Sequence, residues 1–178
     1  MDPDIPLITD LAQVERQAAE NHDRFQVMRY MLERDSISDA QLDALVDATA
    51  APIVDAIDCT QCANCCRSLD VYLTPADAQR LAVGIDVPLD AILDNYVDRK
   101  GPQRVGEWGR FRARPCAFLD GRLCSVYAHR PETCRTYPMF TPDFRWVLED
   151  LIDGASLCPI IYNVLLRMID VTDALSRR

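Results

Sequence analysis

The sequence lacks a long apolar stretch. No segment approaches the roughly 20 apolar residues that a membrane-spanning helix requires. The first residues show neither the basic segment nor the apolar segment of a secretory signal. These absences predict a protein that stays in the cytoplasm and has no membrane span. In a reducing cytosol, clustered cysteines are more often metal ligands or catalytic groups than partners in disulfides.

The sequence also has little positive charge. It carries 19 Lys and Arg against 28 Asp and Glu, which gives a net charge of −9 at pH 7. Sequence-independent nucleic-acid binding depends on cationic neutralisation of phosphates, and adsorption to an anionic membrane depends on cations as well. The composition therefore predicts neither a nucleic-acid partner nor a membrane partner. An acidic surface could instead favour a basic protein partner.

Several enzyme signatures are missing. The sequence has no glycine-rich phosphate loop, no GxSxG elbow and no HExxH helix. It also lacks the CxxxCxxC spacing of radical-SAM enzymes, and no pair of carboxylates stands out by its spacing. If the chain is an enzyme, its chemistry has to come from a bound metal or from a thiol. The sequence leaves open whether it is one.

What the sequence does have is cysteine, eight in a chain of 178 residues. Four of them fall within the CxxCxxCC run that begins at Cys59. Cysteines separated by two residues on a tight loop can point their sulfurs at one centre, whereas burial of a thiol requires no such spacing. All eight are therefore candidate metal or cofactor ligands: Cys59, Cys62, Cys65, Cys66, Cys116, Cys124, Cys134 and Cys158.

The spacing of the thiols bears on which metal they hold. A consecutive C-x2-C-x2-C triplet completed by a distant cysteine holds the [4Fe–4S] cluster of bacterial ferredoxins, and Cys59, Cys62 and Cys65 form such a triplet. Structural zinc usually takes CxxC-type pairs from separate loops, and eight thiols are compatible with two zinc sites. The expected cofactor is an iron–sulfur cluster of the [4Fe–4S] type, with zinc as the alternative. Structural disulfides and a metal-free redox thiol system stay open as further uses of the cysteines.

Caps and hydrophobic periodicity predict a mainly α fold. A small irregular β-hairpin element at Asp120-Gly121 accompanies the helices, in a single cysteine-rich, metal-centred domain. Further strands are expected at 110–114 and 144–148. Pro52 is expected to kink or break the second helix. Helices are predicted at 10–34, 38–57 and 74–82, and others beginning at Pro88, Pro131 and Pro159.

The expected organisation places an N-terminal helical region at residues 1–58. A cysteine-cluster metal-binding domain follows at 59–178, and it includes the C-terminal helix. This division rests on the position of the first cysteine, because every cysteine falls after residue 58.

Ordered motifs surround the cysteines. After the CxxCxxCC run come Thr74-Pro75-x-Asp77, then Pro115-Cys116-x-Phe118-Leu119-Asp120-Gly121, then Arg130-Pro131-x-x-Cys134-Arg135, and a late Cys158. In this order the motifs resemble the YkgJ-like cysteine-cluster family, the CxxCxxCC zinc- or iron-chelating domain, over residues 59–158. The resemblance implies metal chelation by the cysteines. Some relatives carry the name flagellin lysine N-methylase, so the resemblance also implies a protein lysine N-methylase-like enzyme as a candidate.

One position departs from the family pattern. The family often has Gly directly after the second cysteine, where this sequence has Ala63. Gly would allow a positive φ at no steric cost. Either Ala63 has an ordinary conformation or the path of the loop differs.

Two functional hypotheses follow. In the first, the cysteines hold a redox-active iron–sulfur cluster, and the protein transfers electrons or assists a modification reaction. In the second, structural zinc stabilises the fold of a small domain that works by binding a protein partner. Metal is the one ligand common to both.

Overall fold

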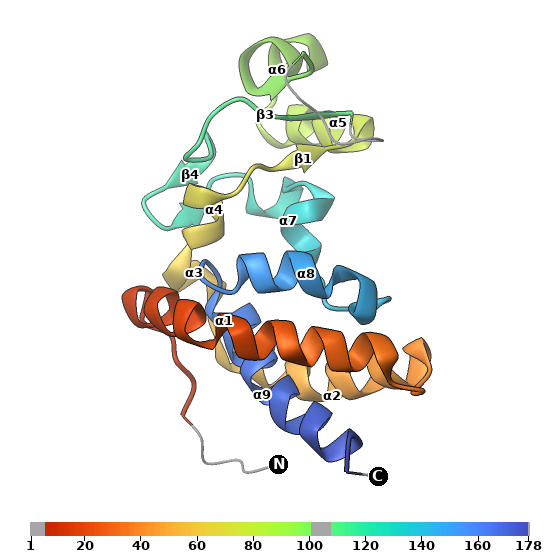
Figure 1. Ribbon diagram of the computed structural model, residues 1–178. Helices are drawn as coiled ribbons and strands as arrows, with labels where there is room; N and C mark the ends of the chain where they lie inside the picture. Colours follow the sequence, from red (N-terminus) through yellow and green to blue (C-terminus); the bar gives the residue numbers. More distant parts are fainter. Residues whose placement is uncertain (1–5, 101–107, 178) are drawn as a thin grey trace. The chain divides into compact units, whose positions relative to one another are not determined.

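The computed structural model describes residues 6–100 and 108–177, and it shows the mainly α fold that the sequence predicts (Figure 1). Its contacts divide the chain into two compact units. One, here called the helical unit, comprises Met1–Asp58 and Pro138–Arg178; the other, the cysteine unit, comprises Cys59–Tyr137. The C-terminal helix groups with the N-terminal helices, because it packs against both of them.

Four helices build the helical unit: α1 (Leu11–Arg34), α2 (Asp39–Ala56), α8 (Phe144–Gly154) and α9 (Pro159–Leu175). Both α1 and α2 contact α8 and α9. Phe25, Leu42, Phe144 and Tyr162 are fully buried in the core that results. Burial of each such side chain stabilises the fold by about 1.5–3 kcal/mol, so the apolar faces of the helices account for their association.

The first two helices begin where their caps predict. The Asp10 carboxylate accepts the backbone N–H of Gln13, and Ser38 forms a capping box with Gln41. Of the kink or break expected at Pro52, the break is wrong, because α2 continues through the proline to Ala56. Ile53, on the next position, is only 5% exposed, and its burial favours continuation of the helix despite the backbone bond that proline removes.

The strand predicted to begin at Phe144 is wrong, since this segment is the first turn of α8. An alternation over five residues is too short to separate a strand from a helix. In the helix, Phe144, Leu148 and Leu151 recur at steps of four and three and are buried. Asp43 of α2 caps the helix from a distance: its carboxylate accepts the N–H groups of Asp143 at 2.9 Å and Phe144 at 3.0 Å.

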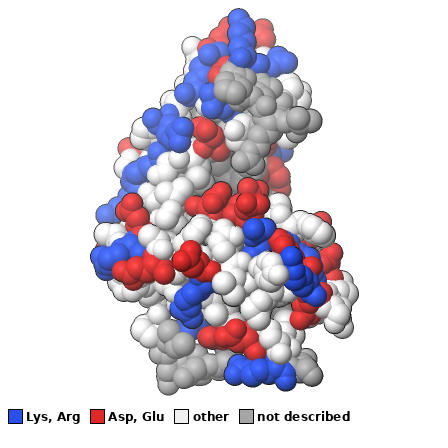
Figure 2. Space-filling model, viewed as in Figure 1, with Lys and Arg blue, Asp and Glu red and all other residues white. Residues whose placement is uncertain are grey.

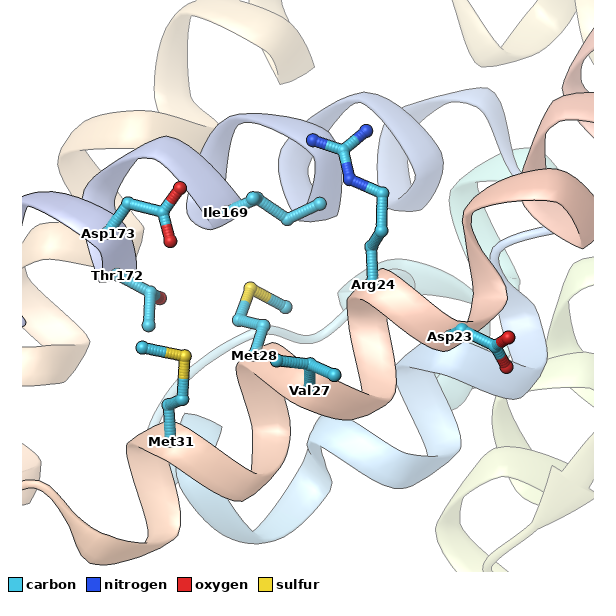
Figure 3. A pocket seen from close by; sticks show the side chains of 8 residues that line it. All are labelled: Asp23, Arg24, Val27, Met28, Met31, Ile169, Thr172 and Asp173. Atoms are coloured by element: carbon cyan, nitrogen blue, oxygen red, sulfur yellow. The ribbon is translucent and has the colours of Figure 1, made fainter.

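A groove of about 280 Å³ opens between α1 and α9 (Figure 3). In Figure 3, Met28 and Met31 of α1 lie across from Ile169 and Thr172 of α9. No cysteine lines this groove, so it is not part of the candidate metal centre. The lining residues that the structure describes are Asp23, Arg24, Val27, Met28, Met31, Ile169, Thr172 and Asp173.

Both signs of charge appear on the face drawn in Figure 2. Acidic and basic side chains are interspersed there, in keeping with a chain of 28 acidic and 19 basic residues. Within the described part of the chain, no helix combines the length and the apolar character needed to cross a membrane.

The cysteine unit consists of short elements. Its helices are α3 (Cys59–Cys62), α4 (Asn64–Ser68), α5 (Pro75–Gly84), α6 (Leu89–Tyr96), the 3-10 turn η1 (Tyr127–His129) and α7 (Glu132–Thr136). Its strands are β1 (Tyr72–Leu73), β2 (Val97–Asp98), β3 (Gly109–Phe111), β4 (Leu119–Asp120) and β5 (Leu123–Cys124).

Two small antiparallel sheets organise these strands. The first has the order β1-β3-β2, with Tyr72 opposite Arg110 and Val97 opposite Phe111. The second is the predicted hairpin, in which Leu119 pairs with Cys124 and Gly121 has a φ of 60°. The strand expected at 110–114 forms only at its start, in β3.

An apolar cluster lies beneath these elements. It includes Leu81, Ile92, Phe111, Phe118 and Val126, and two half-buried cysteines pack against it: Cys116 and Cys124. The contact between α5 and η1 is close, because a Cβ at Gly84 would lie 2.6 Å from the His129 ring. Glycine therefore allows η1, which precedes Arg130, to approach α5.

A buried carboxylate connects α5 to α7. Asp77 is 1% exposed, forms a capping box with Thr74 and pairs with Arg80. It also accepts the backbone N–H of Glu132, the first residue of α7, at 3.0 Å. Burial opposes its ionisation, but the hydrogen bonds from Thr74 and Glu132 and the charge of Arg80 outweigh burial and lower the pKa of Asp77.

We expect Asp43→Ala to lower the free energy of unfolding by about 1–2 kcal/mol, because two N–H groups at the start of α8 lose their acceptor. Denaturant unfolding at pH 7, followed by circular dichroism, measures this loss. Asp55→Ala, at an exposed position of α2, the helix that also carries Asp43, is the control and should change stability by less than about 0.5 kcal/mol. Equal losses in the two variants would show that Asp43 is not a cap.

Asp77→Asn tests the buried carboxylate through its pH dependence. The pKa of Asp77 is lowered from 3.8 in the fold, so its ionisation stabilises the protein above 3.8 and this contribution is lost as pH falls through the folded pKa. At pH 7 the variant should be less stable by about 1–3 kcal/mol, and the difference should shrink in acid. Thermal unfolding at pH 7 and at about pH 3 measures it, with exposed Asp90→Asn as control; a difference that is independent of pH contradicts the assignment.

Candidate metal centre

The CxxCxxCC run folds as two single-turn helices. Cys59 and Cys62 bound α3, while Cys65 and Cys66 lie on α4. Between the helices, Ala63 has φ 51° and ψ 19°, which is the left-handed conformation. An ordinary conformation of Ala63, one of the two expectations from the sequence, is therefore wrong. The alanine adopts the backbone geometry for which glycine is favoured, at a cost of about 1–2 kcal/mol.

Arg67 fastens this loop to the hairpin. Its guanidinium donates to the carbonyl of Cys62 at 2.9 Å and to the carbonyl of Gly121 at 2.8 Å. The first bond closes α3 onto α4, and the second joins α4 to the turn between β4 and β5, which Figure 1 draws beside it. The planar fork of arginine suits two acceptors at once, so one side chain fixes the loop against the hairpin.

Four thiols of the cysteine unit gather near one another: Cys66, Cys116, Cys124 and Cys134. The backbone N–H of Cys116 donates to the carbonyl of Cys66 at 2.8 Å. Leu119, which pairs with Cys124, donates its N–H to the carbonyl of Cys116 at 3.1 Å. Cys134 lies on α7, which is held by the bond from Glu132 to Asp77. All four residues are partly exposed.

The pKa values of these thiols show that they influence one another. Contact with the Cys65 thiol, 4.0 Å away, together with the charges of Arg67 and Arg130, lowers the pKa of Cys66 to about 6 despite partial burial. Burial raises the pKa of Cys134 to about 12, and the negative charges of Cys116, Cys66 and Cys124 raise it further.

Cys116 and Cys124 behave like Cys134. Burial is the largest cause that raises the pKa of the Cys116 thiol, and the neighbouring charges of Cys66 and Cys124 raise this pKa further. Burial also raises the pKa of Cys124, and Cys66 adds to it, while the charge of Arg130 acts in the opposite direction. Thiols that repel one another as thiolates are stabilised in the charged form by a shared cation.

Arg130 is a cation that acts on three of these thiols. Its charge contributes to the lowered pKa of Cys66, and it opposes the burial that raises the pKa of Cys124 and Cys134. The guanidinium lies over the Tyr127 ring at 3.9 Å, and Arg135 donates to the carbonyls of Arg130 and Ala128. Stacking and these two bonds hold the positive charge in place.

The predicted ligands do not all fall in one unit. Cys158 lies in the helical unit, where it is 7% exposed at the N-cap of α9. The other seven cysteines belong to the cysteine unit. Cys59 is exposed, and Cys62 and Cys65 are partly exposed.

The donor set fits a thiophilic metal. All eight cysteines are free thiols, and soft thiolate ligands select zinc, iron–sulfur clusters and copper(I). Among the residues that the structure describes, no three Cys, His, Asp or Glu side chains converge closely enough to hold an ion. Rotation between staggered χ1 rotamers re-aims a sulfur while the backbone stays in place, so binding requires the thiols to turn toward a common centre.

Sequence reasoning found the thiols and included Arg130 in the motifs that surround them. It did not find the bridge from Arg67 to Gly121, nor the part of Asp77 in placing α7. Both are side-chain bonds to backbone groups more than 50 positions away, and no local pattern signals them. For Asp77 the sequence shows only the capping box with Thr74.

Two substitutions test the left-handed position of Ala63. Ala63→Gly removes the strain but also a buried methyl group and adds freedom to the unfolded chain, so stability should change by less than about 1 kcal/mol. Ala63→Val places a β-branched residue there and should cost about 2 kcal/mol or more. Thermal unfolding and metal content of the purified chain measure both effects. Ala76→Val, at an exposed position of α5, is the control; an equally mild effect at Ala63 argues against the left-handed turn.

Comparison with family models matches residues 58–158 to the family described as "CxxCxxCC: Putative zinc- or iron-chelating domain". No curated protein and no solved structure matches the chain significantly. The matched segment covers more than half of the 178 residues and contains all eight cysteines, which confirms the resemblance drawn from the motifs. The chain therefore belongs to the CxxCxxCC zinc- or iron-chelating domain family.

Proposed function

We propose that the protein holds an iron–sulfur cluster through its cysteines, with Cys59, Cys62 and Cys65 as the principal ligands. The main observation in support is the arrangement of these three thiols on two consecutive single-turn helices that are joined by a left-handed residue. Consecutive thiols at this spacing are the ligand pattern of the bacterial [4Fe–4S] cluster. The family description, which names iron as one of two metals, supports the proposal.

The surroundings suit a redox group. Such a cluster, when bound, supplies one-electron transfer. Arg67 places a positive charge next to Cys66 and donates to the carbonyl of Cys62. Charges and hydrogen bonds around cysteine sulfurs set the reduction potential of a thiolate-ligated centre. Cys59 is exposed and Cys62 and Cys65 are partly exposed, so a redox partner or a substrate for modification can approach this loop.

Anaerobic purification tests the proposal directly. We expect a brown protein with about four iron and four sulfide per chain, whose visible absorption bleaches in air. Cys59→Ser, Cys62→Ser and Cys65→Ser should each lose most of the iron. Gln61→Ser, at an exposed position of α3, is the matched control and should keep it. A colourless chain with stoichiometric zinc and no iron after anaerobic preparation contradicts the iron–sulfur proposal.

A further inference from the structure

We propose that Cys66, Cys116, Cys124 and Cys134 form a second metal site, distinct from the Cys59-Cys62-Cys65 triplet, and that this site takes structural zinc. The inference deepens the proposed function and rests on its premise that the cysteines bind metal. It divides the CxxCxxCC run between Cys65 and Cys66, so that neighbouring residues serve two different centres.

The first argument is the grouping of these thiols. Leu119 pairs with Cys124 and donates its N–H to the carbonyl of Cys116. Arg135, the neighbour of Cys134, donates to the carbonyl of Ala128, four residues after Cys124. Cys116 is tied to Cys66 by a backbone hydrogen bond, and both Cys116 and Cys124 pack against one apolar cluster. Hydrogen bonds and packing therefore bring the segments that carry these thiols together.

The second argument is the way in which the chain supplies the ligands. Cys66 comes from α4, Cys116 and Cys124 come from the two sides of the β4–β5 hairpin, and Cys134 comes from α7. Structural zinc takes four ligands in a closed tetrahedral site that joins separate loops, whereas the consecutive triplet is the iron–sulfur pattern. The four cysteines come from separate segments, although none of them forms a CxxC pair with another. The two sets therefore differ in spacing as they would differ in metal.

The third argument is charge. A zinc ion with four thiolates carries a net charge of about −2, which has to be offset in a partly buried site. Two arginines neighbour this group in the chain. Arg67 follows Cys66 on α4 and donates to the carbonyl of Gly121 in the hairpin turn, and Arg130 lies just before α7, which carries Cys134. The stack of Arg130 on Tyr127, at 3.9 Å, keeps one of these charges fixed. The surroundings thus provide compensation for the charge of a closed tetrathiolate site.

The fourth argument is mechanical. The segments that carry the four thiols are short, and α7 has no side-chain cap of its own. Small domains with little regular structure gain folding energy from a metal that joins their segments. Zinc at this place would join α4, the hairpin and α7 and leave the triplet on α3 and α4 free for its own ligand.

The test compares one cysteine from each set in the full-length protein, purified anaerobically. Zinc and iron are measured by mass spectrometry, together with acid-labile sulfide. We expect Cys124→Ser and Cys134→Ser to lose about one zinc per chain and to keep iron and sulfide. Cys59→Ser should do the reverse. Far-UV circular dichroism establishes that each variant is folded.

A second measurement does not depend on the variants. The wild-type chain is depleted of zinc with a chelator and titrated with Co²⁺, which reports a tetrahedral thiolate site by its visible absorption. We expect about one equivalent to bind, also in Cys59→Ser, and added zinc to displace it.

The outcomes separate the two proposals. Loss of the same metal from both sets of variants shows a single site and overturns the proposal of a separate zinc site. Iron–sulfur retained with no zinc and no Co²⁺ uptake also overturns it, while the proposed cluster stands. Zinc retained with no iron overturns the cluster and leaves the zinc site. A folded wild-type chain that takes up no metal overturns both.

Discussion

The cysteine unit depends on one buried carboxylate. Asp77 completes the cap of α5 and accepts the first N–H of α7, so a single charged group joins the N-termini of two helices. A helix of five residues has little stability of its own, and α7 lacks a side-chain cap from its own segment. The position of Cys134 on α7 therefore depends on a carboxylate 57 positions earlier, held ionised by hydrogen bonds and by Arg80.

The thiols are gathered in a similar way, by bonds to the backbone more than by regular structure. Arg67 connects the carbonyls of Cys62 and Gly121, and Cys116 donates its N–H to the carbonyl of Cys66. These bonds place several sulfurs near one another although their thiolates repel. A cation resolves that repulsion, and binding and local folding are then coupled.

The family is described as chelating zinc or iron, and the proposed division would give each of these metals its own set of cysteines. Zinc suits a closed site that joins segments, because it has no redox chemistry. An iron–sulfur cluster suits a triplet on an accessible loop, because its function is electron exchange. The left-handed Ala63 lies within the triplet and turns the chain between the second and third cysteines.

The sequence by itself determined the features that arise from neighbouring residues. Asp10, Ser38 and Thr74 predict the starts of their helices, since each side chain accepts the backbone N–H three residues ahead. Asp120-Gly121 predicts the hairpin. The ordered cysteine motifs determined the family. Only the tertiary structure decided what depends on residues far apart. The segment from Phe144 is a helix whose start is capped by Asp43 of α2. Cys66 lies close to Cys116 because the backbone N–H of Cys116 donates to the carbonyl of Cys66. Local patterns report local bonds, whereas the composition of a metal site depends on which distant segments the fold brings together.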